Sequence, residues 1–226
     1  MAARGWAEPS AENGWLSKRT APCTGRQRAP FVAAMFNDTS SPIALLTTRR
    51  SGKPRDLVAP GPDDVQLRQI LNIALRTPDH GKIAPWRFVI VPQDRRAALA
   101  TLLETAYLKE KPDAGRLEIE SMSQFAHQAP VLVVALSAPV AGSKIPVWEQ
   151  ELSTGAAVMN LLHGAHALGF AGGWLTGWPS FNEDVRRAFA KGDERIAGFV
   201  FIGTPGRPLE ERPRPDYDDI VSIWER

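Results

Sequence analysis

Basic and hydroxyl side chains are concentrated in two short segments of the chain. The first segment, Thr47–Lys53, has the sequence TTRRSGK and combines two guanidiniums with hydroxyl groups and an amine. The second segment, Arg76–His80, adds another arginine and a histidine about one helix later. A guanidinium offers a rigid fork of donors that matches phosphate, and a serine hydroxyl adds one more donor. The two segments together predict a site for a phosphorylated cofactor. The alternative for the first segment is a solvated basic turn, and the alternative for the second is an ordinary helix C-terminus.

A glycine-rich segment, Gly169–Gly177 with the sequence GFAGGWLTG, is the second feature that indicates a ligand. Glycines let a backbone approach a flat ligand closely, whereas the alternative is a tight turn between a helix and a strand. The segment is not a dinucleotide-binding fingerprint, because its glycine spacing and its helix-before-strand order differ from that motif. Farther along, Phe201–Pro205 ends a strand with Gly-Thr-Pro, and Arg207 just beyond it is a further candidate for a phosphate contact.

Histidine and glutamate side chains could in principle bind a metal ion or transfer protons, but their spacing does not favour a metal site. His163 and His166 are three residues apart on a predicted helix, but neither a Glu-x-x-His counterpart nor a cysteine accompanies them. We therefore interpret them as packed core histidines rather than metal ligands. Glu149 and Glu151 suit a helix start, since carboxylates are stabilised at the positive end of the helix dipole. His80 is an alternative candidate as a proton donor.

The elements that must position these residues begin near residue 40. Pro42–Leu46 predicts a short opening helix, with Ser40 or Ser41 as its cap. A second helix is predicted to start at Asp63 or Asp64, because the apolar residues that follow have helical spacing, and to end before Pro78. Further helices are predicted over residues 97–108, 115–127, 151–168 and 185–189, and strands over residues 88–91, 131–136, 171–175 and 198–202.

Two of these elements are expected at the centre of the fold. Val131–Leu136 is an unbroken apolar run, which is typical of a central strand. The helix over 151–168 is apolar on most sides and contains several small residues, so we predict that it is buried all round, inside one core or between two subunits. Because helices and strands alternate irregularly, the predicted class is α+β, with a doubly wound α/β fold as the second choice.

The composition is that of an ordinary globular protein. Of the 226 residues, 43% are hydrophobic and 23% charged, and no apolar run approaches the ~20 residues that cross a bilayer. The single cysteine, Cys23, excludes an internal disulfide and a multi-cysteine metal site, and is typical of a reducing, cytoplasmic compartment. The formal net charge is +2, but residues 1–34 hold five basic and two acidic residues, so the remainder carries −1. A nearly neutral body gives no electrostatic footprint for nucleic acid.

The first 34 residues differ in composition from the rest of the chain. Residues 1–34 are rich in Ala, Pro, Gly, Ser and Arg and show no sustained period, which predicts a disordered extension. They lack the apolar core of a secretory signal. A transit peptide is one alternative, and the one we favour is that translation begins at Met35, just before the patterned region. Residues 35–226 are then expected to form one domain.

The order of these motifs resembles the nitroreductase family, in particular its minimal single-domain, FMN-dependent NAD(P)H nitroreductases. The resemblance runs from about Ser41 to Pro205 and rests on five ordered strings: Arg49-Arg50-Ser51, Arg76-x-Pro-Asp-His80 with Pro85-Trp86, Trp148–Glu151, Gly169–Gly177, and Gly203-Thr204-Pro205. It implies a nitroreductase-like α+β fold with a central mixed sheet flanked by helices. It also implies a homodimer with two FMN sites at the interface, each built from both subunits.

The resemblance assigns roles to residues as well. Three residues are expected to contact the phosphate and ribityl groups of FMN: Arg49, Arg50 and Ser51. Two are expected to reach FMN from the partner subunit: Arg76 and His80. Three are expected to border the flavin ring, where a backbone N–H faces N5: Trp174, Leu175 and Thr176. Neither a catalytic side chain nor a metal ligand is expected, because hydride transfer belongs to the flavin.

The activity that the resemblance implies is a ping-pong reaction. Hydride passes from NAD(P)H to the flavin, and then to a nitro compound, a quinone or a similar acceptor in the same place. Two alternatives stay open: a non-catalytic flavin-binding or regulatory protein, and another reductive reaction on the same scaffold, such as dehalogenation or enoate reduction. The sequence leaves open the physiological acceptor and the choice between NADH and NADPH.

Overall fold

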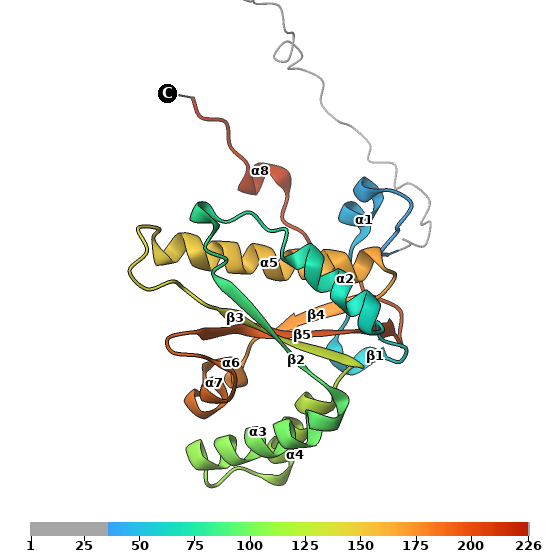
Figure 1. The fold of residues 1–226 in the computed structure, drawn as a ribbon. Helices are drawn as coiled ribbons and strands as arrows, with labels where there is room; N and C mark the ends of the chain where they lie inside the picture. The colour runs from blue at the N-terminus through green and yellow to red at the C-terminus, as the bar shows by residue number, and fades with distance from the viewer. Residues whose placement is uncertain (1–35, 226) are drawn as a thin grey trace, which may run out of the picture. The chain divides into compact units, whose positions relative to one another are not determined.

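A five-stranded sheet lies between two layers of helices in the computed structural model, which describes residues 36–225 (Figure 1). The strands are β1 (Leu57–Val58), β2 (Trp86–Val91), β3 (Val131–Ser137), β4 (Ala171–Leu175) and β5 (Arg195–Pro205). Their order is β1-β5-β3-β2, and β4 pairs with β5. The predicted α+β class is confirmed. All four pairings among the described strands are antiparallel, which corrects the expected mixture of parallel and antiparallel strands.

Strand β3 buries side chains on both of its faces. Leu132, Val134 and Leu136 belong to one hydrophobic cluster, whereas Val133 and Ala135 belong to another. Successive side chains of a strand point to opposite faces of a sheet, so an unbroken apolar run needs cover on both sides. The prediction of a central strand is therefore confirmed.

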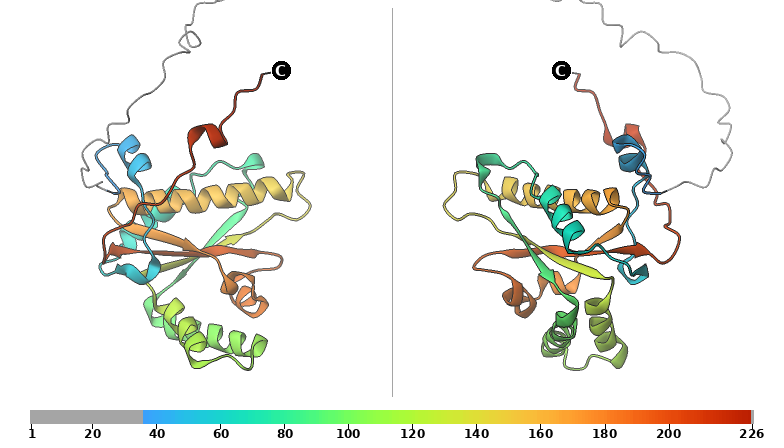
Figure 2. Two further views of the ribbon diagram at one scale, coloured as in Figure 1. Left: turned by 180° about the vertical axis from the view of Figure 1, so that it is seen from behind. Right: turned by 45° about the vertical axis from the view of Figure 1, so that its right-hand side comes forward.

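Each cluster is completed by its own helices (Figure 2). On one face lie α2 (Asp64–Ala74) and α5 (Val147–Ala167), which bury side chains against the alternate residues of β3 and β5. On the other face lie α3 (Arg96–Glu110), α4 (Arg116–His127) and α7 (Glu183–Phe189). The helices over 97–108, 115–127 and 185–189 were thus predicted within a few residues of their ends.

The first two helices begin at the caps that the sequence indicates. The helix α1 (Pro42–Thr48) starts where the Ser41 hydroxyl accepts a hydrogen bond from the Ala44 N–H at 3.0 Å. At the start of α2, Asp63 accepts from the Gln66 N–H at 2.8 Å, and the Gln66 side chain accepts from the Asp63 N–H in return. Two short helices were not predicted: α6 (Trp178–Phe181) and α8 (Tyr217–Ile220).

Helix α5 is longer and less enclosed than predicted. It begins at Val147, about one turn before the predicted start, so the Trp148–Glu151 string lies inside it. Its inner side chains are buried, but Trp148 is 68% exposed and Leu152 55% exposed. Burial all round is therefore wrong for the single chain, and burial between two subunits stays a prediction.

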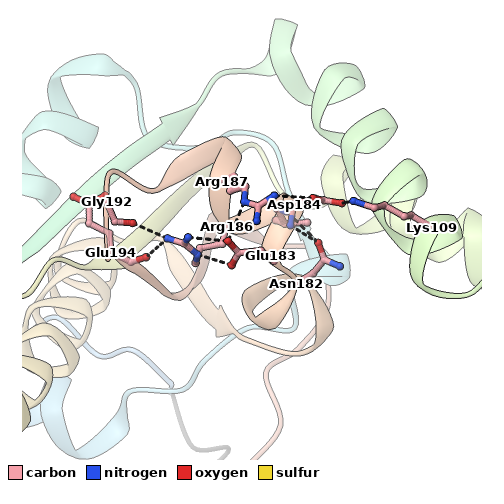
Figure 3. A network of polar contacts seen from close by, with 9 residues as sticks. Lys109, Asn182, Glu183, Asp184, Arg186, Arg187, Gly192 and Glu194 are labelled. Carbon is pink, nitrogen blue, oxygen red and sulfur yellow. Dashed lines mark hydrogen bonds and ion pairs between the residues drawn. The ribbon is translucent and has the colours of Figure 1, made fainter.

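A polar network ties α7 to its surroundings (Figure 3). Arg186 donates to Glu183 and to the carbonyls of Gly192 and Glu194, just before β5, at 2.7–3.1 Å. Asp184 accepts from Lys109 of α3 at 2.7 Å. The hydrogen bonds from Arg186 lower the pKa of Glu183 to about 2, so this carboxylate stays charged across the ordinary pH range. The network therefore holds α7 in place on the same face of the sheet as α3.

No helix within residues 36–225 is long and apolar enough to cross a membrane. The predictions for residues 1–34, including the disordered extension and the start at Met35, lie outside the described residues, as does Cys23.

Candidate functional site

One cavity of about 610 Å³ brings together five of the eight predicted site residues. Arg49, Arg50 and Ser51 line it together with Trp174 and Leu175. These segments are more than a hundred positions apart in the sequence. The rest of the lining comes from residues 52–57, from Met159 and Leu162 of α5, from Gly173, and from residues 205 and 207–214. The cavity thus joins basic side chains to an apolar wall.

The loop after α1 is held in place by its own hydrogen bonds. The Arg50 N–H donates to the Asn37 side chain at 2.9 Å, and the Arg50 guanidinium donates to the Arg49 carbonyl at 2.7 Å. The Arg49 guanidinium donates to the Ser51 hydroxyl at 3.4 Å. The three residues therefore form a preorganised group of donors rather than a mobile basic turn.

Strand β4 runs against this loop at a glycine pair. The Gly52 N–H donates to the Gly172 carbonyl at 3.1 Å. A Cβ atom on Gly173 would lie 2.5 Å from the Gly52 carbonyl oxygen and 3.1 Å from Pro54. Any side chain at Gly173 would push the loop and the strand apart, so glycine is required for the close approach that shapes the cavity.

Trp174 stands at the wall of the cavity with its ring fixed by β5. Its Nε1–H donates to the Ala197 carbonyl at 3.0 Å. The neighbouring Gly198 has a φ of +151°, and a Cβ atom there would lie 2.1 Å from Trp174 Nε1. The absence of a side chain at Gly198 therefore makes room for the indole.

The segment after β5 supplies cations that sequence reasoning missed. Arg212 and Arg214 line the cavity together with Arg55 and the predicted candidate Arg207. The only sequence signal was the Arg-Pro-Arg-Pro string at 212–215, which sits in a stretch without helical or strand periodicity. Proximity to the Arg49–Ser51 loop, some 160 residues earlier, could not be inferred from it.

Acidic residues neutralise only part of this charge. Glu211 pairs with Arg50, and Glu210 pairs with Lys53 at 2.9 Å. Burial lowers the pKa of the Arg49 guanidinium, and the positive charges of Arg214 and Arg50 lower it further. Cations that repel one another inside a cavity favour the binding of an anion.

Comparison with known proteins decides the family. Residues 46–204 match the model of the nitroreductase family. The chain belongs to the nitroreductase family. The protein of Haemophilus influenzae called "Putative NAD(P)H nitroreductase" is 38% identical over 184 residues, which are 80% of this chain and 97% of that protein.

Solved structures agree with this family assignment at the level of the fold. A nitroreductase-like family protein from Bacillus cereus matches with a TM-score of 0.68 and 22% identity, over 80% of this chain and 94% of that one. A variant of the FMN- and NADPH-dependent nitroreductase NfnB from Sphigopyxis sp. strain HMH matches with a TM-score of 0.61 and 19% identity, over 79% and 96% of the two chains. The expected nitroreductase-like fold is confirmed.

Three predicted site residues of this nitroreductase-family chain do not line the cavity: Arg76, His80 and Thr176. Arg76 is exposed just beyond α2, and Thr176 is exposed just beyond β4. His80 Nδ1 lies 2.8 Å from a carboxylate oxygen of Glu149 on α5. The contact of Arg76 and His80 with the cofactor of the partner subunit, and that of Thr176 with the flavin ring, stay predictions.

Two histidines of α5 differ in their surroundings. His166 is fully buried, as predicted for a core histidine, and its Nε2 accepts the Gly172 N–H at 3.1 Å. Burial, with the positive charges of Arg49 and His163, lowers the pKa of His166 to about 3. His163 is half-buried, and burial lowers its pKa as well. Among the described residues, no three His, Cys, Asp or Glu side chains are grouped so as to hold a metal ion.

Proposed function

We propose that the chain is an FMN-dependent oxidoreductase that uses NAD(P)H to reduce nitro compounds, quinones or similar small acceptors. The observation that carries the proposal is a single cavity, on a nitroreductase-family fold, that is lined both by an arginine pair and by apolar side chains. Such a cavity suits a ligand with a phosphate at one end and a flat ring at the other. The relatives named for NAD(P)H, and the FMN-dependent NfnB, support the choice of cofactor and co-substrate.

The residues of the cavity fit FMN on two observations. The Arg50 Nε atom is buried and has no hydrogen-bond partner among the described residues, so the guanidinium has a donor to spare for a phosphate. The cavity is also lined by seven basic residues against three acidic ones, which favours an anionic ligand. A buried unpaired donor and an excess of cations are both features of a site for an anion.

Each part of the cavity has a proposed task. Arg49, Arg50 and Ser51 hold the phosphate by charge-assisted hydrogen bonds, which are stronger than those between neutral groups. Trp174 and Leu175 border the ring and exclude water from one side of it. When bound, FMN supplies the redox chemistry, accepting hydride from NAD(P)H and passing electrons to the acceptor. The side chains therefore position the reactants, and none is assigned as an acid or base.

We also propose that the protein is a homodimer in the cytoplasm, with Arg76 and His80 serving the cavity of the partner subunit. Exposed apolar side chains on two helices support this proposal. Trp148 and Leu152 are exposed on α5, and Ile43 of α1 is 71% exposed. Large exposed apolar side chains favour association with another protein surface.

An absorbance spectrum of the purified protein, before and after anaerobic addition of NADPH or NADH, tests the proposal. We expect a flavin spectrum that bleaches on addition of one or both nicotinamides and recovers on addition of a nitroaromatic or a quinone. Flavin that stays oxidised would favour a non-catalytic flavin-binding protein. Bleaching without recovery by either acceptor would favour another reductive reaction on this fold. Protein that cannot take up FMN would refute the assignment.

A further inference from the structure

We propose that residues 207–214 form a strap that opens and closes the cavity, and that Glu210 and Glu211 are the positioning residues that hold it closed. Opening of this strap then sets the rates at which FMN enters and leaves. The inference rests on the proposed function for the identity of the ligand, whereas the strap itself is inferred from contacts within the chain.

The strap lines the cavity along its whole length. Every residue from 207 to 214 contributes to the lining. None of these residues belongs to a helix or a strand, and the segment connects β5 to α8 as an extended chain (Figure 2). Pro208 and Pro213 restrict the backbone, so the segment is stiff and moves as one piece. Displacement of the strap would therefore open the cavity to solvent.

The strap is anchored at its first residue and not at its far end. The Gly206 N–H donates to the Asp56 carbonyl at 2.8 Å, and Arg207 Nε lies 3.7 Å from Asp56 Oδ1. Within the described part of the chain, no backbone hydrogen bond joins residues 207–214 to another segment. Every residue over 210–225, including the short α8, is exposed. In the single chain the strap is thus free to turn about its start, as hinged segments do.

Two ion pairs hold the strap against the loop after α1. Glu211 pairs with Arg50, and Glu210 pairs with Lys53 at 2.9 Å. The Arg50 side chain is only 12% exposed, whereas the Glu211 side chain is 55% exposed. A fixed, nearly buried cation therefore holds a carboxylate that is itself on the surface. The remaining hold beyond the anchored start is Leu209, which is half-buried.

The loop is the rigid partner of these ion pairs, and the strap is the part that moves. The Arg50 N–H donates to the Asn37 side chain, and the Gly52 N–H donates to β4. Hydrogen bonds from Lys53 and Arg50 lower the pKa values of Glu210 and Glu211, so both carboxylates are charged at neutral pH. Exposed ion pairs contribute little to stability, so a strap held by them opens readily.

Arg50 can hold the strap and a phosphate at the same time. Its pairing with Glu211 leaves the buried Nε without a partner among the described residues. A phosphate bound at Nε therefore does not require the ion pair with Glu211 to break. The strap stays closed around the bound ligand, and the ligand leaves only when the two ion pairs open.

The rates of FMN binding and release test this strap. We expect Glu211→Gln to raise both the association and the dissociation rate constants of FMN by about fivefold, and Glu210→Gln to raise both by about twofold, because the second ion pair is exposed at both ends. Glu120→Gln removes an exposed ion pair with Arg116 on α4 and is the matched control, which should change neither rate constant. Stopped-flow flavin fluorescence measures association, and an excess of another FMN-binding protein traps the flavin that dissociates.

The two rate constants together distinguish a strap from a simple effect of charge. Removal of a negative charge beside the cavity would by itself speed the entry of the anionic FMN and slow its release. Faster entry together with faster release in Glu211→Gln supports the strap. Unchanged or slower release, or faster release without faster entry, would overturn it. If the wild type does not take up FMN, the proposed function fails, and proteolysis then decides the strap by itself.

Cleavage by a glutamyl endopeptidase near neutral pH reports opening of the strap without any flavin. Lys53→Gln releases Glu210 from its ion pair and keeps both glutamates as cleavage sites. We expect cleavage after Glu210 or Glu211 to be about twofold faster in this variant than in the wild type, because cleavage follows the population of the open form. Lys109→Gln removes an ion pair with Asp184 and should be cut like the wild type. Mass spectrometry of the released C-terminal peptide measures the rates, and equal rates in all three proteins would overturn the proposal.

Discussion

The buried His166 should make the stability of the protein depend on pH between about 3 and 6.5, because its neutral ring accepts a hydrogen bond near the cavity. Its Nε2 accepts the Gly172 N–H, and the Gly172 carbonyl accepts the Gly52 N–H in turn, both at 3.1 Å. His166 on α5 thus holds β4 at Gly172, and the same residue of β4 holds the loop at Gly52. Because Nε2 is an acceptor, the neutral ring carries its proton on Nδ1, and protonation of Nε2 would break the bond.

The sign and size of the pH effect follow from the pKa of this group. Burial, Arg49 and His163 lower the pKa of His166 to about 3 in the folded protein, against 6.5 for an ordinary histidine. A lowered folded-state pKa means that the stabilisation is complete above pH 6.5 and is lost as the pH falls towards 3. Each pH unit in this window corresponds to about 1.4 kcal/mol, so about 2 kcal/mol is lost between pH 6.5 and pH 5.

Substitution of His166 by Gln removes this dependence. The glutamine side chain reaches about as far as Nε2 and can accept the Gly172 N–H through its oxygen, but it does not gain a proton between pH 7 and pH 5. We expect the decrease in the free energy of unfolding between pH 7 and pH 5 to be about 2 kcal/mol smaller in His166→Gln than in the wild type. Urea denaturation at both pH values, at one protein concentration and without added FMN, measures this difference.

The comparison isolates His166 because all carboxylates are common to both proteins. His127→Gln, at an exposed histidine of α4, is the control and should keep the pH dependence of the wild type. Equal pH dependence in His166→Gln and the wild type would show that His166 does not stay neutral in the folded state, and the reasoning from its burial would be wrong.

Three further substitutions test the cavity and the proposed interface. Arg49→Ala should weaken FMN binding by roughly 1.5–3 kcal/mol, the worth of a charge-assisted hydrogen bond, as measured by equilibrium dialysis. Gly198→Ala should lower the free energy of unfolding by about 1–3 kcal/mol in urea and change the fluorescence of Trp174, because its Cβ atom would overlap the indole. Leu152→Glu should convert a dimer to a monomer in sedimentation velocity, since it places a charge in the proposed apolar interface.

Two of these substitutions have a matched control variant, and the third has a result that would contradict its prediction. Arg116→Ala should bind FMN like the wild type, and equal loss in both variants would mean that Arg49 acts only through net charge. Leu117→Glu changes a leucine on α4 that is 72% exposed, and should leave the oligomeric state unchanged. Unchanged stability of Gly198→Ala would show that β5 can move away from Trp174 at little cost.

The sequence predicted the parts of the fold whose cause is local. The apolar run of β3 has a cause in its own residues, because a strand covered on both faces needs no polar side. The cap of α1 at Ser41 also depends on neighbours only a few residues away. Residues Arg49–Ser51 and Trp174 were found by resemblance of motifs, and the structure brings them to one cavity.

The parts that the sequence could not predict depend on contacts between distant segments. Strand β1 has only two residues, Leu57 and Val58, and exists because the end of β5 pairs with it. Just beyond that pairing, Arg207 Nε lies 3.7 Å from Asp56 Oδ1. Arg96, one residue before the predicted helix over 97–108, is buried and donates to the carbonyls of Val91 and Ala126, at the ends of β2 and α4. No local pattern encodes such a partner.

The position of Arg76–His80 favours a site built from two subunits. This segment follows α5 through three contacts: Asn160 with Thr77, Ser153 with the Pro78 carbonyl, and Glu149 with His80, at 2.7–3.0 Å. On the same helix, Trp148 and Leu152 are exposed at a spacing of four residues, and Met159, seven residues farther, lines the cavity. Residues spaced by four and seven share a helix face, so the exposed stripe leads into the cavity. We therefore expect a second copy that covers this stripe to bring its own Arg76 and His80 to the cavity that they do not reach within one chain.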